Sequence, residues 1–245
     1  MVIMSYEETN RINNVLISAV SHELRTPIAA IKGYSTMLLD YFPELTVKET
    51  KEYIQSIDNA TDRLTRLVEN LLDTSRLEAG LLKLEKTKVN IASLIKAAVK
   101  EAETSDKHHK IITVLDNNTT MVYIDPKLIR QVLDNLLENA AKCSPKGTEI
   151  LISTNNNGQE LKISVTDHGT WTPAGDLNSI CEHMNGSEEK ASPGTNGIGL
   201  RLYICQRLIA AHGGRMRAEA ADKGNAVQFT LPLTPVKSKE KLIYV

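Results

Sequence analysis

The sequence has little cysteine, and this scarcity excludes two kinds of small domain. Cys143, Cys181 and Cys205 are the three cysteines among 245 residues, and no two of them form a C-x-x-C pair. Three widely spaced thiols cannot build a disulfide framework or a cysteine-rich metal site. We therefore expect reduced thiols in an intracellular protein.

Long apolar runs are also missing. No segment reaches the roughly 20 apolar residues that a transmembrane helix requires, and the first residues lack the pattern of a signal peptide. The chain as given is therefore expected to be cytoplasmic, with no membrane segment.

The sequence also lacks an excess of basic or of acidic residues. The 29 basic and 30 acidic residues nearly cancel, so no global field attracts nucleic acid or an anionic membrane. Any nucleotide must then be held by a local site. A length of 245 residues with 41% apolar content suits one large domain or two smaller ones, and we expect two.

The first part of the chain has the pattern of a helical hairpin. Apolar residues recur at three- and four-residue steps over about 5–41, and a break that contains Pro43 separates this helix from a second one. In the second helix Ile57, Leu64 and Leu71 recur at seven-residue spacing, the pattern of a seam for a partner helix. We predict a homodimer whose two hairpins form a four-helix bundle. The alternative is a hairpin packed on its own downstream domain.

The rest of the chain alternates between helix and strand patterns, which indicates a two-layer α/β sandwich. We predict helices over 91–103, 127–142 and 198–211, and strands over 111–115, 121–124, 150–153, 161–166, 215–220 and 227–231. The fold class is thus α + α/β, a hairpin forming a dimeric bundle and then a sandwich domain. The predicted boundaries are 1–82, 83–234 and a C-terminal tail over 235–245. His108 and His109 are expected to be solvated turn residues.

The first candidate site is the segment SHELRTP, from Ser21 to Pro27, inside the first predicted helix. The carboxylate of Glu23 can accept a proton from one ring nitrogen of His22 while the other nitrogen attacks phosphorus. An imidazole with an unperturbed pKa of about 6.5 is largely neutral near pH 7 and available as a nucleophile. Pro27 lacks an N–H, so we expect the helix to bend after the His–Glu pair. The alternative is a solvated histidine on a dimer helix.

A second candidate site lies on the helix predicted over 127–142. Asn135 and Asn139 are four residues apart and share one helix face. Their amide oxygens suit Mg²⁺, which commonly bridges to substrate phosphates. Lys142, near the same end, can meet a phosphate as a point charge. The alternative for Asn135 is a surface residue.

Further candidates lie at a strand end and in a glycine-rich segment. Asp167 ends a predicted strand, and its carboxylate can accept a hydrogen bond from an adenine amino group, although such residues are often turn formers. Gly194, Gly197 and Gly199 precede a helix, where small residues let backbone N–H groups approach phosphate. The segment is neither a P-loop nor a dinucleotide fingerprint, because the lysine and the preceding strand are missing.

Together these segments resemble the catalytic core of a bacterial sensor histidine kinase of two-component systems. Such a core has a dimerisation and phosphotransfer domain followed by an ATP-binding domain of the family shared with gyrase, Hsp90 and MutL. SHELRTP is highly specific, and gyrase-like and chaperone-like relatives lack that helix. The resemblance implies an autokinase that uses ATP and Mg²⁺, phosphorylates its own histidine and passes the phosphoryl group to an aspartate of a response-regulator receiver domain.

The resemblance also implies residue roles. His22 would be the phospho-acceptor, Glu23 the proton acceptor, and Thr26 would position water during removal of phosphate from the partner. Asn139 would be the main Mg²⁺ ligand, and 185–196 would form a mobile lid. The residues implied to hold the nucleotide are Asn135, Asn139, Lys142, Asp167, Gly169, Gly197, Gly199 and Leu200.

Several positions depart from the family pattern. Trp171 stands at the second glycine of the D-x-G-x-G box, and the segment 180–184 has none of the usual phenylalanines. Cys143 replaces a common tyrosine, and Gly194 is displaced. Trp171 either packs the lid in place of the missing aromatics or fills the pocket and prevents ATP binding. The second outcome would leave a phosphatase or a receiver-docking scaffold; a chaperone-like ATPase would hydrolyse ATP without the histidine.

Overall fold

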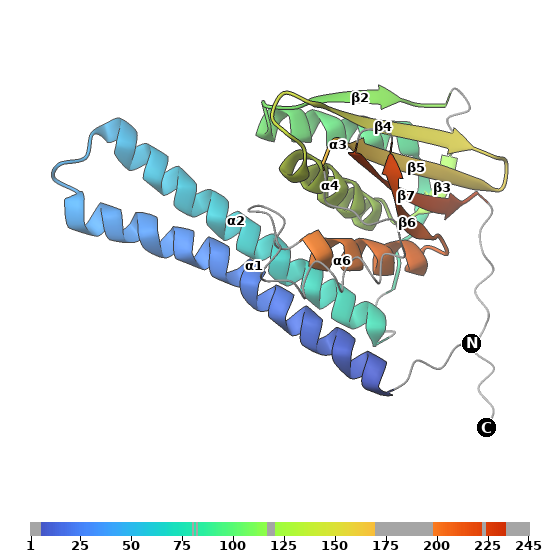
Figure 1. Ribbon diagram of the computed structural model, residues 1–245, viewed down its shortest axis with the longest axis horizontal. Coiled ribbons are helices and arrows are strands. Elements are labelled where there is room, and N and C mark those ends of the chain that lie inside the picture. Colours follow the sequence, from blue (N-terminus) through green and yellow to red (C-terminus); the bar gives the residue numbers. More distant parts are fainter. Residues whose placement is uncertain are drawn as a thin grey trace. The chain divides into compact units, whose positions relative to one another are not determined.

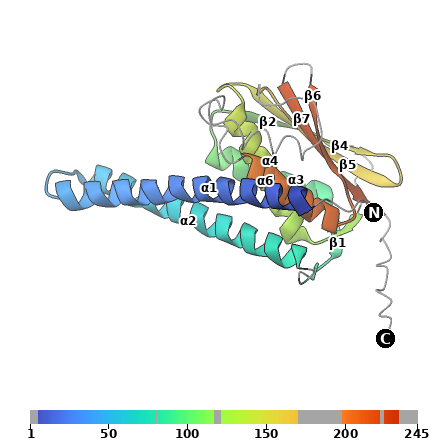
Figure 2. The same cartoon turned by 60° about the horizontal axis from the view of Figure 1, so that its bottom comes forward.

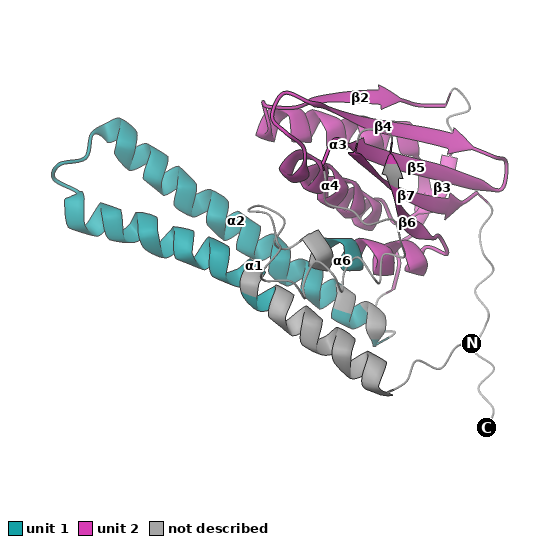
Figure 3. Ribbon diagram, in the orientation of Figure 1, with its two compact units in different colours: residues 1–82, 181–204 teal, residues 83–180, 205–245 magenta. Residues whose placement is uncertain are grey.

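The structure is a computed structural model that describes residues 6–79, 81, 83–116, 121–169, 198–221 and 224–233. The chain divides into two compact units (Figure 3). One unit contains residues 1–82 and 181–204, and the other contains 83–180 and 205–245. The predicted boundaries at 82/83 and 234/235 stay a prediction.

The first unit contains the predicted hairpin. Helix α1 spans Tyr6–Tyr41 and helix α2 spans Val47–Glu78, and the two run alongside each other in both views (Figures 1 and 2). The predicted break between them is confirmed. Helix α1 continues through the buried Pro27 as one helical span, so the proline does not end it.

A capping box starts α2. The hydroxyl and backbone N–H of Thr46 both donate to Oε2 of Glu49, at 2.6 and 2.9 Å, and the N–H of Glu49 donates back to Thr46 Oγ1 at 3.2 Å. The side-chain bond from Thr46 lowers the pKa of Glu49. This reciprocal pattern satisfies N–H groups that a helix start otherwise leaves unpaired.

Large apolar side chains remain exposed along the hairpin. They include Ile28, Leu39, Phe42, Ile54, Val68 and Leu72. The seven-residue series of Ile57, Leu64 and Leu71 is half-buried. An apolar stripe that one hairpin leaves uncovered is typical of a surface that binds another helix pair.

The second unit is built on a five-stranded sheet in the order β2-β4-β5-β7-β6. These strands are Lys110–Val114, Glu149–Asn156, Glu160–Asp167, Gly224–Pro232 and Met216–Ala221. The β2–β4 pair is parallel and the other pairs are antiparallel. Helices α3 (Ile91–Ser105) and α4 (Pro126–Cys143) cover one face (Figure 1), which confirms the two-layer sandwich.

A separate two-stranded ribbon was not predicted in full. Strand β1 (Thr87–Asn90) pairs antiparallel with β3 (Met121–Ile124), outside the five-stranded sheet. The sequence predicted the second of these strands but missed β1, whose four mostly exposed residues carry little alternation. Pairing with β3 rather than intrinsic pattern makes this segment a strand.

Asp125 and His212 join the start of α4 to the end of helix α6 (Ile198–Ala211). The Asp125 carboxylate accepts from the N–H groups of Lys127 and Leu128, which caps α4. The backbone N–H of Asp125 donates to Nε2 of His212 at 3.1 Å, and Nδ1 of this buried ring lies 2.8 Å from the carbonyl oxygen of Leu208. These partners require the neutral form protonated at Nδ1, and burial lowers the pKa of His212.

The expectation for His109 was wrong. Its side chain is only 5% exposed, and Nδ1 lies 2.6 Å from Oδ2 of Asp106. Its Nε2 lies 3.2 Å from the carbonyl oxygen of Pro145. His109 thus links the end of α3 to the turn after α4, whereas His108 is exposed as predicted.

In the described part of the chain, we find no helix with the length and apolar character needed to cross a bilayer.

Candidate functional site

The two predicted asparagines of α4 are buried, and three of their four polar atoms have no partner among the described residues. Asn139 is 3% exposed and Asn135 is 8% exposed, so the surface alternative for Asn135 is wrong. Within the described residues, neither Nδ2 nor Oδ1 of Asn139 has a hydrogen-bond partner, and nor does Nδ2 of Asn135. Buried amides are almost always paired in native proteins, because an unpaired one costs about 1–3 kcal/mol. The two amides therefore mark a site that awaits a polar ligand.

Asp167 ends β5 in a buried polar cluster. It is 2% exposed, and its Oδ1 accepts a hydrogen bond from the N–H of Gly169 at 2.7 Å. Nδ2 of Asn225 lies 3.5 Å from the same oxygen and donates to the carbonyl oxygen of Gly169 at 2.6 Å. The carboxylate is thus oriented by a local turn and by an amide from β7. The prediction that Asp167 marks a strand end is confirmed, and its role in binding stays a prediction.

Asn225 is a site residue that the sequence analysis missed. It is 3% exposed and lies 58 residues from Asp167 in the chain. The β5–β7 register pairs Asp167 with Asn225, which brings the two side chains together. An asparagine directly after a glycine reads as a turn signal, so the sequence carried no local pattern that pointed to this role.

Gly224 permits the close approach of β7 to the end of β5. Its φ is +135°, and a Cβ atom there would lie 2.0 Å from the carbonyl oxygen of Asp167. A side chain at this position would displace the backbone that carries the carboxylate. Glycine at 224 is therefore part of what places Asp167.

The end of α4 lies beside the end of β5. The buried hydroxyl of Ser144, the C-cap residue of α4, accepts from the backbone N–H of His168 at 3.2 Å. Burial raises the pKa of the Cys143 thiol to about 12, with the charge of Asp167 adding to the rise and Lys142 opposing it. Cys143 is therefore a protonated, unreactive neighbour of this site.

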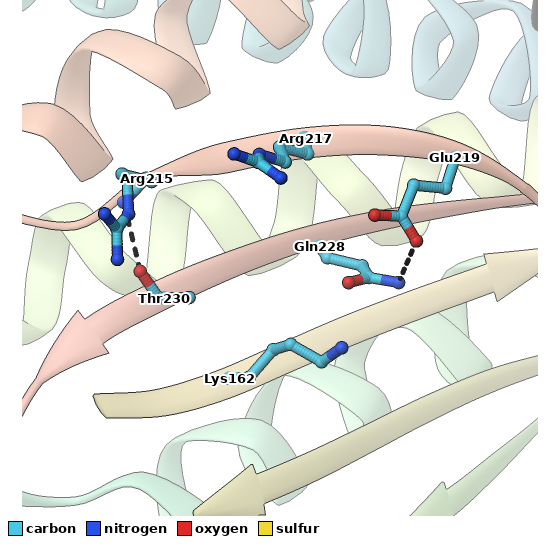
Figure 4. Close-up of a pocket in the computed structure, with 6 residues that line it drawn as sticks. All are labelled: Lys162, Arg215, Arg217, Glu219, Gln228 and Thr230. Carbon is cyan, nitrogen blue, oxygen red and sulfur yellow. Dashed lines mark hydrogen bonds between the residues drawn. The ribbon is translucent and has the colours of Figure 1, made fainter. Parts of the chain in front are cut away.

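One surface cavity of the second unit lies on another face of the sheet. It has a volume of about 370 Å³ and is lined by Lys162, Arg215, Arg217, Glu219, Gln228 and Thr230 (Figure 4). Along β5, Ile163, Val165 and Asp167 are buried, while Lys162 is exposed. Because strand side chains alternate between faces, the cavity opens on the face opposite to Asp167. It is not the site that the predicted nucleotide residues form.

In the hairpin, the carboxylate of Glu23 is buried and ion-paired. Its side chain is 4% exposed, and Nη2 of Arg63 from α2 lies 3.3 Å from Oε2. Nη2 of Arg201, from the part of α6 that belongs to the same compact unit, lies 3.9 Å from that oxygen. Thr26 is exposed one turn further along α1.

Other predicted site features fall outside the described residues. These are Trp171, Gly194, Gly197, the segments 180–184 and 185–196, and the tail over 235–245. The side chains of His22 and Leu200 also fall outside them, and of Gly199 only the helical backbone is described. His22 lies in the helical span of α1, and Gly199 and Leu200 lie in the first turn of α6. Among the described residues, no three His, Cys, Asp or Glu side chains group as a metal site.

Comparison with known families gives two matches. Residues 12–80 match the model of the His Kinase A (phospho-acceptor) domain. Residues 124–235 match the model of the histidine kinase-, DNA gyrase B- and HSP90-like ATPases. The first match contains Glu23 and Arg63, and the second contains Asn135, Asn139 and Asp167.

Two curated relatives illustrate the likeness. The chain is 33% identical over 226 residues to Sensor protein KdpD of Clostridium acetobutylicum, which covers 92% of this chain and 25% of that protein. It is 30% identical over 234 residues to Sensor histidine kinase WalK of Bacillus subtilis, with 94% and 38% covered. The chain thus spans well under half the length of these relatives.

Solved structures share the fold. Acinetobacter baumannii histidine kinase AdeS superposes with a TM-score of 0.64 at 23% identity, covering 87% of this chain and 98% of that one. Histidine kinase ThkA, solved in complex with the response regulator protein TrrA, gives a TM-score of 0.61 at 25% identity, with 94% and 66% covered.

Proposed function

We propose that this chain, which belongs to the family of sensor histidine kinases, is an ATP-dependent autokinase that phosphorylates His22. The ATPase family match supports the use of ATP. The observation that carries the proposal is the pair of buried asparagines, Asn135 and Asn139, on the helix next to Asp167, with three polar atoms that have no partner among the described residues. A fold that needed no ligand there would gain stability by replacing both amides with apolar side chains.

We propose that Asp167 binds the adenine amino group and that α4 faces the phosphates. Asp167 is held in one orientation by Gly169 and Asn225, as a carboxylate that reads a base edge must be. Lys142, in the last turn of α4, supplies a positive charge for the phosphates. Gly169, Gly197, Gly199 and Leu200 are proposed to shape the pocket and its lid.

The amides also fit Mg²⁺. We propose Asn139 as the main ligand, with Asn135 close to the phosphates, because neutral amide oxygens are hard donors and Oδ1 of Asn139 has no partner among the described residues. A bound Mg²⁺ would neutralise the charge of the phosphates. This chain's own contribution is to hold the nucleotide and to exclude water from the buried face of α4.

In the proposed reaction, a ring nitrogen of His22 forms a bond to the γ-phosphorus as the bond from phosphorus to the β,γ-bridging oxygen breaks and ADP leaves. The proton of the imidazole passes to the carboxylate of Glu23. Thr26, which is exposed, is proposed to position water when the phosphoryl group is removed from a partner. Phosphoryl transfer depends mainly on positioning and charge stabilisation. In this proposal the residues on α4 and at the end of β5 supply both for the nucleotide, and Glu23 accepts the proton.

We also propose partners for the whole protein. A second copy would cover the exposed apolar residues of the hairpin and complete a four-helix bundle. The phosphoryl group would pass from His22 to an aspartate of a response-regulator receiver domain, and the solved complex of ThkA with a response regulator supports this class of partner. Because the reaction uses cellular ATP, we place this part of the protein in the cytoplasm.

The direct test is incubation of the purified chain with Mg²⁺ and γ-labelled ATP, beside His22→Ala. We expect acid-labile, base-stable label on the parent and none on the variant. ATP hydrolysis that persists without label would instead indicate a chaperone-like ATPase. If neither protein is labelled over a wide range of ATP, the kinase proposal fails, and a phosphatase or receiver-docking scaffold becomes the better assignment.

A further inference from the structure

Glu23 is paired with cations from other helices. Its carboxylate is almost fully buried, and Arg63, 40 residues further along the chain, approaches it from α2. Arg201 is the second cation that faces the same oxygen. Burying a carboxylate is costly unless such partners meet its oxygens, and the partners also fix where those oxygens lie. The placement of the Glu23 carboxylate thus depends on its cationic neighbours.

The ion pairs hold the carboxylate at one oxygen only. Strong charge-assisted N–H···O⁻ bonds are about 2.7–2.9 Å long, and arginine often makes two of them. Arg63 instead makes one contact of 3.3 Å, and Arg201 lies 3.9 Å away. Both contacts end on Oε2, so Oε1 belongs to neither ion pair. A carboxylate held in this way keeps one oxygen for a further partner.

Arg63 is poorly arranged for a purely stabilising role. Its Nε is buried and has no hydrogen-bond partner among the described residues. An unmet buried donor lowers stability, and replacing a buried ion pair by apolar residues of similar size is often neutral or stabilising. The arrangement therefore serves the carboxylate more than the packing of the hairpin.

We propose that Arg63 is a positioning residue for autophosphorylation, which acts by holding the carboxylate of Glu23 in place on α1. Arg63 does not touch the phosphoryl group in this proposal; it works through the proton acceptor. The inference rests on the function proposed above. It adds Arg63, a residue of α2, to the residues of α1 that are proposed to take part in the reaction.

The test compares Arg63→Met, which keeps the length of the side chain and removes its charge, with Arg63→Lys, which restores the charge. The initial rate of His22 labelling is measured at neutral pH. We expect Arg63→Met to lose about tenfold in this rate, a modest part of what a general base contributes. Arg63→Lys should recover most of the rate.

Arg66→Met is the matched control. Arg66 lies three residues further along α2 and is exposed, so its loss should leave the labelling rate unchanged. An unchanged rate in Arg63→Met would overturn the inference. So would a loss of rate that lysine does not restore, since that result would indicate a structural role.

A second measurement separates this inference from the proposed function. The chemical shift of the Glu23 carboxyl carbon can be compared by NMR at one pH in the parent and in Arg63→Met, with no need for activity. We expect this signal to move in the variant, because the carboxylate loses its partner on α2. An unlabelled parent would overturn the kinase proposal alone, whereas an unmoved carboxyl signal would overturn the role of Arg63 alone.

Discussion

At the scale of residues, two buried asparagines in the same unit behave oppositely. Asn225 uses its Nδ2 to donate to the carbonyl oxygen of Gly169 at 2.6 Å. Asn139 is buried to the same extent and has no partner for either polar atom within the described residues. The amide of Asn225 stabilises the fold, whereas the unpaired amide of Asn139 lowers its stability. Such a loss of stability is expected where a residue is kept for function.

This contrast predicts opposite effects on stability for the same change. Asn139→Leu should raise the free energy of unfolding by about 1 kcal/mol, because it removes an unpaired buried amide, and it should abolish binding of Mg²⁺–ATP. Asn225→Leu should lower the free energy of unfolding by about 1–3 kcal/mol, because it leaves the carbonyl oxygen of Gly169 unpaired. Urea unfolding and a fluorescent ATP analogue measure the two quantities. A loss of stability in Asn139→Leu would contradict a ligand site on α4.

At the scale of elements, the hydrogen bond that links the end of α6 to the start of α4 depends on a neutral histidine. His212 accepts a hydrogen bond from the N–H of Asp125, so the ring cannot be protonated at Nε2 without losing this bond. Burial lowers its pKa, and the nearby Lys86 lowers it further, while the Leu208 carbonyl and Asp125 act in the opposite direction. This hydrogen bond links the start of α4 to the end of α6, between residues that are 87 positions apart in the chain.

The lowered pKa predicts a loss of stability in mild acid. Below the unfolded pKa of about 6.5 the unfolded chain binds a proton at His212 that the folded chain does not, so unfolding becomes more favourable as the pH falls. The contribution is therefore complete above about pH 7 and declines from about pH 6.5 towards the lower folded pKa. Thermal melting of the parent and of His212→Gln between pH 5 and pH 8 tests this. We expect the variant to be less stable at pH 8 and to depend less on pH, and equal slopes for the two proteins would contradict the assignment.

At the scale of the whole molecule, the hairpin leaves apolar surface that its two helices cannot cover. Val68 and Leu72 are 44% and 50% exposed at four-residue spacing on α2, and Ile28 of α1 is also exposed. A second hairpin would bury these residues in a four-helix bundle. The alternative, a hairpin covered by the chain's own second domain, predicts a monomer.

We predict that the chain is a dimer and that Val68→Glu with Leu72→Glu makes it monomeric, because buried glutamates without partners oppose association. Light scattering coupled to size exclusion measures the mass. Val114→Glu is the control, since Val114 is 56% exposed, more than Val68 or Leu72, but lies on β2, so this change should leave the dimer intact. A monomeric parent would favour the alternative.

The sequence by itself determined the features that depend on local pattern. The helical hairpin, the amphipathic α4 with its two asparagines and the His–Glu–Pro segment follow from periodicity and from a short run of neighbouring residues. Most element ends differ from the predicted ones by one to three residues, because caps and strand pairing set the ends. The four-residue β1 was missed since its pattern is too short to read.

Only the tertiary structure decided which distant groups meet. Arg63 reaches Glu23 across 40 residues, Asn225 reaches Asp167 across 58, and the Asp125 N–H reaches His212 across 87. The sequence also could not show that Asn135 is buried or that His109 is covered, because burial depends on neighbours that the fold supplies. Local patterns report backbone preference and helix faces, whereas the ionisation and orientation of a site residue depend on partners brought together by packing.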